Sequence, residues 1–125
     1  MAPLTTSLVT VAAEAASAKT IEPTVVIEVG DLLAITDYFV ISSGRNDRQV
    51  RAIADEVQMQ VKGHGGSHPR AIEGLDDARW ILMDYGDFVV HVFDEEARAF
   101  YDLERLWADA PRLNWTRREL TADRH

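Results

Sequence analysis

Two short apolar segments separated by three residues constrain the fold of this 125-residue chain more than any other feature. Residues 80–84 and 88–93 are rich in Val, Ile, Leu and aromatic residues, and Tyr85-Gly86-Asp87 between them suits a tight turn. We therefore expect an antiparallel hairpin with its turn at Gly86-Asp87. The resulting register pairs Trp80 with Phe93, Leu82 with His91 and Asp84 with Val89.

The rest of the chain shows the patterns of three helices and three further strands. Helices are expected over residues 5–19, from the N-cap Asn46 to about Gly63, and from the N-cap Asp94 to Pro111. The apolar side of the last helix, which we expect to face the core, consists of Ala97, Phe100, Tyr101, Leu103, Leu106 and Trp107. Strands are expected at residues 24–29, 38–42 and 70–73. The order α-β-β-α-β-β-β-α favours a mixed β-sheet flanked by helices, which belongs to the α/β (α+β) class.

The charge and composition exclude several function classes. The formal net charge is −8, which argues against binding a nucleic-acid backbone, and the absence of cysteine excludes disulfides and thiolate metal sites. No apolar run approaches the roughly 20 residues that span a bilayer, and the first residues lack the pattern of a secretory signal. We therefore expect a cytoplasmic protein with no direct nucleic-acid specificity and no membrane segment.

Charge also divides the chain into two parts. Residues 1–110 carry 19 acidic and 9 basic side chains, a net charge of −10, and we expect them to form one folded domain. Residues 111–125 carry four arginines against two acidic residues and few large apolar groups, so we expect a loosely ordered C-terminal tail.

Three groups of polar residues are candidates for chemistry, and each has a simpler interpretation. Asp84 and Asp87 could bind a divalent metal or act as acid and base, although acidic residues are common in turns. His64 and His68 have the i, i+4 spacing of metal ligands, but glycines and a proline prevent a helix there. Ser43-Gly44 precedes a helix as an anion-binding turn does, without a glycine-rich loop. We therefore predict no catalytic residue, no metal site and no cofactor.

The two faces of the predicted hairpin differ in chemistry. One face is purely apolar and is the better candidate for the core: Ile81, Met83, Phe88, Val90 and Val92. The other face mixes large apolar residues with a histidine and a carboxylate: Trp80, Leu82, Asp84, Val89, His91 and Phe93. Such a mixture is typical of a protein-binding surface, although a helix that covers both faces explains it equally well.

Three blocks of this sequence resemble the ribosomal silencing factor family (RsfS, Iojap-like). The first block is Thr36-Asp37-Tyr38-Phe39-Val40-Ile41-Ser42-Ser43-Gly44, continued by Asn46, Arg48-Gln49-Val50 and Ala52-Ile53. The second block covers residues 80–93, and the third contains Arg98, Phe100-Tyr101 and residues 103–110. With the first helix and strand, the resemblance covers about residues 5–110.

The resemblance implies a nucleotidyltransferase-like fold and a non-enzymatic function. Family members bind the large ribosomal subunit through its fourteenth protein (uL14), block joining with the small subunit and repress translation when nutrients are short. Organellar relatives act at the same place during large-subunit assembly. The resemblance also leaves open a homodimer that hides the same surface.

We assign the partner-binding site to the mixed face and the hairpin turn. Affinity is expected from the apolar and histidine side chains, with Trp80 as the main anchor, and orientation from the polar turn. The predicted site residues are Trp80, Leu82, Asp84, Tyr85, Asp87, His91 and Phe93. The alternative is a nucleotidyltransferase-like enzyme or nucleotide-binding protein that uses Ser43-Gly44 with Asp84 and Asp87.

Overall fold

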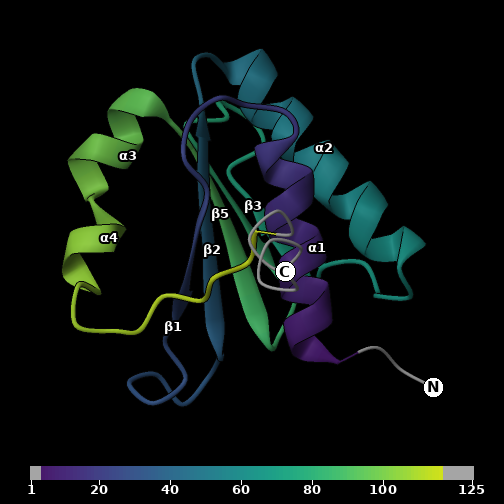
Figure 1. Ribbon diagram of the computed structural model, residues 1–125. Helices are drawn as coiled ribbons and strands as arrows, with labels where there is room; N and C mark the ends of the chain where they lie inside the picture. The colour runs from purple at the N-terminus through teal and green to yellow at the C-terminus, as the bar shows by residue number, and fades with distance from the viewer. Residues whose placement is uncertain (1–3, 117–125) are drawn as a thin grey trace, which may run out of the picture.

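A five-stranded mixed sheet lies between two layers of helices in the computed structural model, which describes residues 4–116 (Figure 1). The strands are β1 (Val25–Glu28), β2 (Tyr38–Gly44), β3 (Ala71–Glu73), β4 (Trp80–Asp84) and β5 (Phe88–Asp94). The helices are α1 (Thr5–Ser17), α2 (Asp47–Gly63), α3 (Glu95–Tyr101) and α4 (Leu103–Leu106). None of the helices within the described range is long and apolar enough to cross a membrane.

The strand order is β1-β2-β5-β4-β3, in which β2 and β5 run parallel and the other neighbours run antiparallel. The crossover from β2 to its parallel neighbour passes through α2, β3 and β4, because a parallel pair cannot be joined by a tight turn. The β4–β5 hairpin has the predicted register, with Trp80 opposite Phe93 and Leu82 opposite His91. The predicted fold class is therefore confirmed.

Each face of the sheet has its own apolar core. α1 and α2 cover one face, where Ile81, Met83, Val90 and Val92 are fully buried, as the alternation predicted. α3 and α4 lie on the opposite side of the sheet (Figure 1), and the second core forms there. Its buried members are Ile27, Val29, Ile41, Phe93, Ala97 and Ala110.

The first turn of α2 has the predicted cap. The Asn46 Oδ1 accepts a hydrogen bond of 2.8 Å from the Gln49 N–H, as an N-cap side chain does. The Gln49 side chain then accepts 2.7 Å from the Arg45 N–H, one residue before the position expected for a capping box. One orphan N–H of the helix and the N–H of the residue before the cap are thus satisfied.

The last helix differs from the sequence-based prediction, because it is two short helices instead of one. Asp102 has a left-handed backbone conformation (φ 46°, ψ 53°) that ends α3 and begins α4. The continuous apolar stripe expected from Ala97 to Trp107 therefore does not form. Phe100 and Leu106, which we expected to be buried, are 79% and 72% exposed.

The beginning of the predicted tail is part of the fold. The Glu28 N–H donates 2.8 Å to the Pro111 carbonyl, and the Leu113 N–H donates 2.9 Å to the Val26 carbonyl. The Trp115 Nε1 donates 3.0 Å to the carbonyl of the residue before β1. Residues 111–116, which we assigned to a loose tail, therefore cover the outer edge of β1, while residues 117–125 lie outside the described part.

Candidate functional site

The predicted site residues on β4 lie on the side of the sheet opposite α1 and α2. Trp80, Leu82 and Asp84 alternate with the buried Ile81 and Met83, and each of the three is half-buried. The strand thus holds three neighbouring side chains at the surface while its other face anchors the core. This arrangement is suitable for contact with another protein.

Trp80 is held by rings on two sides and by one hydrogen bond. Its ring centroid lies 4.9 Å from that of Phe93 on β5 and 4.7 Å from that of Tyr101 on α3. Its Nε1 donates 3.1 Å to the His91 Nδ1. A half-buried tryptophan fixed in this way has little rotamer entropy left to lose when a partner binds.

His91 is buried beneath Trp80 and does not form part of the exposed surface of the site. It is 4% exposed, its ring lies edge-on to Phe39 at 4.6 Å, and burial lowers its pKa to about 4. Because Nδ1 accepts from Trp80, the neutral ring carries its proton on Nε2, which has no hydrogen-bond partner within residues 4–116. Phe93 is 1% exposed. The structure therefore corrects our placement of His91 and Phe93 on the open surface.

The turn residues point in different directions. Asp84 accepts 2.8 Å from the Gly86 N–H and pairs with the Arg70 guanidinium at 3.2 Å. Asp87 is exposed and accepts 3.1 Å from the Thr5 hydroxyl, at the start of α1.

Tyr85 stacks on Phe88 at 4.7 Å and packs against the core under α1 and α2. Burial raises its pKa to about 12. Of the three polar turn residues, Asp84 shares a face with Trp80, whereas Tyr85 packs against the core on the other face and Asp87 contacts α1.

Two exposed aromatic residues that sequence reasoning assigned to the core lie beside Trp80. Phe100 and Tyr101 on α3 are 79% and 49% exposed, and their rings meet edge to face at 5.0 Å. Adjacent residues on a helix can both face one core, as Ile53 and Ala54 do on α2, so the spacing of Phe100 and Tyr101 does not by itself mark them as exposed. The sequence carries no local signal that separates them from core residues; in the structure Ala97 is the buried residue of α3.

The candidate catalytic groups do not meet. Ser43 pairs with Phe93 near one end of β5, and Asp84 pairs with Val89 near the other, about 13 Å apart along the strand. The buried Ser43 hydroxyl is bonded to the Arg98 guanidinium at 2.9 Å. The geometry therefore does not support the nucleotidyltransferase-like alternative.

The described part of the chain also lacks a candidate metal centre. It contains no group of three or more His, Asp or Glu side chains that could hold an ion. His64 and His68 are both exposed, and the His64 Nδ1 lies 2.8 Å from the Gln60 carbonyl oxygen, in the manner of a helix C-terminus.

Comparison with known proteins identifies the family. Residues 3–125 match the family described as "Ribosomal silencing factor during starvation". The chain is 42% identical over 105 residues to the ribosomal silencing factor RsfS of Bacillus subtilis, with 84% of this chain and 88% of the relative covered. It is 39% identical over 84 residues to the mouse "Mitochondrial assembly of ribosomal large subunit protein 1", with 66% of this chain and 37% of the relative covered.

A solved structure supports the same assignment. The crystal structure of a Chromobacterium violaceum protein superposes with a TM-score of 0.80 at 29% identity, covering 85% of this chain and 88% of that chain. The chain belongs to the RsfS family of ribosomal silencing factors.

Proposed function

We propose that this protein binds the large ribosomal subunit through the face around Trp80, contacts uL14 and thereby blocks joining with the small subunit. The observation that carries the proposal is a half-buried tryptophan held by Phe93, Tyr101 and His91 on an otherwise open part of the sheet. Rigid aromatic anchors of this kind supply most of the affinity in many protein interfaces. The mouse relative's name, which refers to the large ribosomal subunit, is consistent with the proposal.

The charge of the protein suits such a partner. The formal net charge is −8, so ribosomal RNA repels the molecule, whereas a basic protein embedded in that RNA attracts it. Electrostatics then favours orientations in which the acidic surface meets protein. Asp84 lies on the same face of β4 as Trp80, at the other end of the strand, and adds a negative charge that can select the orientation.

The mechanism is steric and needs no chemical step. A folded unit that occupies the joining surface prevents the small subunit from approaching, and translation falls with the number of occupied large subunits. Such a protein works in the cytoplasm, where ribosomal subunits join. Self-association as a homodimer through the same face would compete with ribosome binding.

Co-sedimentation with purified large subunits tests the proposal. Wild-type protein should sediment with the subunits and reduce the fraction of joined ribosomes. Trp80→Ala should weaken binding by about 2 kcal/mol, or roughly 30-fold in Kd. Met59→Ala, at an exposed position on α2, is the matched control and should bind as the wild type does. Equal binding by Trp80→Ala would refute this assignment of the interface.

A further inference from the structure

A cavity of about 540 Å³ lies beside Trp80, between α3 and the segment that leads into β4. It is within the size range of pockets that hold small ligands, and so it can hold one long side chain of a docked protein. The site described above does not use this space. Its lining residues are Asp77, Arg79, Trp80, Glu96, Ala97, Phe100 and Tyr101.

Three aromatic rings form one wall of the cavity. Trp80 and Tyr101 lie 4.7 Å apart at 46°, and Phe100 meets Tyr101 at 89°. Because Phe93 and Tyr101 pack on the Trp80 ring, the accessible rings of this wall are chiefly Phe100 and Tyr101, which are exposed. The face of an aromatic ring attracts a cation, most strongly for tryptophan, and a guanidinium can also stack on it.

The charges around the cavity leave an excess of negative charge. Asp77 and Glu96 line it, and Asp94 lies next to it. Arg79 is the basic residue of the lining, and its Nε pairs with Asp94 at 3.3 Å, while Glu96 is 4.0 Å away. Three carboxylates thus surround one guanidinium, which pairs with Asp94 and reaches Glu96. The remaining negative charge favours a second cation at the cavity.

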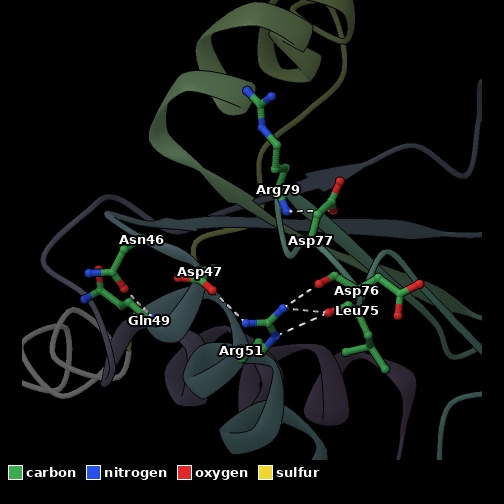
Figure 2. A network of polar contacts seen from close by, with 8 residues as sticks. All are labelled: Asn46, Asp47, Gln49, Arg51, Leu75, Asp76, Asp77 and Arg79. Atoms are coloured by element: carbon green, nitrogen blue, oxygen red, sulfur yellow. Dashed lines mark hydrogen bonds and ion pairs between the residues drawn. The ribbon is translucent and has the colours of Figure 1, made fainter.

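The segment that carries Asp77 is held in place by α2. Arg51 donates to the Leu75 carbonyl at 3.0 and 3.2 Å and to the Asp76 carbonyl at 2.7 Å. Figure 2 shows this clamp, with Asp77 and Arg79 on the far side of the segment and the Arg79 side chain extending toward the helices above. The cavity therefore has one rigid wall before any partner arrives, which lowers the entropic cost of binding.

We infer that this cavity is the binding site for one arginine side chain of the partner protein, stacked on the aromatic wall and paired with Glu96 and Asp77. The inference rests on the proposed function and names the chemistry that the partner presents next to the Trp80 anchor. An arginine satisfies the aromatic faces and the unbalanced carboxylates together, whereas an apolar side chain satisfies only the rings.

Binding to purified large subunits at several salt concentrations tests the charge. Glu96→Gln should weaken binding about fivefold at low salt and reduce the salt dependence. Glu95→Gln, the same change one position away on α3 and outside the cavity, should stay within twofold of wild type. Equal effects of the two variants would overturn the inference.

A second substitution separates an arginine from an apolar occupant. Phe100→Leu keeps an apolar side chain of similar reach but removes the ring, and Phe100 is exposed enough for the fold to tolerate the change. An arginine occupant predicts a loss of at least fivefold in affinity. Unchanged affinity would indicate an apolar occupant and refute the inference.

A titration without ribosomes tests the arginine site separately from the proposed binding to the large ribosomal subunit. The probe is N-acetyl-arginine amide, followed by NMR at the Trp80 indole N–H, with N-acetyl-citrulline amide as the neutral isostere. We expect saturable shifts with the arginine compound that are lost in Glu96→Gln. Absent shifts, or equal shifts with both compounds, would refute the cavity's role. Failure of the wild type to sediment with large subunits would instead refute the proposed function.

Discussion

The buried His91 makes the stability of this protein sensitive to acid. Burial lowers the pKa of His91 from 6.5 to about 4, and its ring is surrounded by Phe39, Phe93 and Trp80. Above pH 6.5 the imidazole is neutral in both the folded and the unfolded chain. Between pH 6.5 and 4 the unfolded chain binds a proton that the folded protein excludes, so the free energy of unfolding falls as the pH falls.

The size of the effect follows from the width of that window. A difference of about 2.5 pKa units, at about 1.4 kcal/mol per unit, sets an upper limit of about 3.5 kcal/mol. About 3 kcal/mol of it is lost between pH 7 and pH 4, because the folded protein is itself half protonated at pH 4. For a domain of this size, such a loss is a large part of the total stability. Below about pH 4 the folded protein also binds the proton, and this contribution stops growing.

Denaturant unfolding of wild type and His91→Gln, followed by circular dichroism from pH 7.5 to 4, measures the effect. Glutamine keeps an acceptor for the Trp80 indole but does not titrate, and contributions from carboxylates cancel in the comparison. The wild type should lose about 3 kcal/mol relative to His91→Gln as the pH falls. His64→Gln, at an exposed histidine, should follow the wild type. A constant difference between wild type and His91→Gln at all pH values would refute the reasoning.

Three further predictions concern stability, measured by denaturant unfolding at pH 7.5. Gly74→Ala should lower the free energy of unfolding by more than about 2 kcal/mol, because φ is +87° and a Cβ would lie 1.9 Å from a backbone oxygen of β4. Gly63→Ala, at an open helical position, should instead raise it by about 0.5–1 kcal/mol. Asp102→Gly should gain up to about 1 kcal/mol by relieving the left-handed conformation, and a loss would contradict this. Ile81→Ala, on the buried face of β4, should lower the free energy of unfolding by about 2–4 kcal/mol, and Leu82→Ala, on the half-buried face, by about 1 kcal/mol. Equal losses would refute the assignment of Ile81 to the core face and Leu82 to the open face.

The parts of the fold that could be predicted from the sequence are those fixed by local patterns. The β4–β5 register follows from a three-residue turn between two alternating segments, because a shift of one residue would expose Ile81 and Val90. The start of α2 follows from Asn46, whose side chain satisfies a helix N–H at a fixed spacing. In both cases the information lies within a few residues of the element that it determines.

The features that could not be predicted depend on contacts between distant segments. The break at Asp102 needs a left-handed conformation at a residue other than glycine, and helix-forming patterns on both sides hide it. The pairing of Pro111 and Leu113 with β1 joins segments more than 80 residues apart. The burial of His91 depends on Phe39 from β2 and Trp80 from β4, which the pattern of β5 alone cannot show.

A candidate interface around Trp80 could be predicted from the sequence. Which of its residues are exposed and which are buried beneath Trp80 could not. Alternation along β4 and β5 places Trp80, His91 and Phe93 on one face, and it carries no information on how much of that face a helix covers. Because α3 follows β5 directly and buries Ala97, it covers the β5 side and leaves the β4 side open. His91 and Phe93 thus become the support of the anchor, and Phe100 and Tyr101 replace them at the surface. Substitutions of the supporting residues should therefore act first on stability, and substitutions of the exposed aromatic residues first on binding.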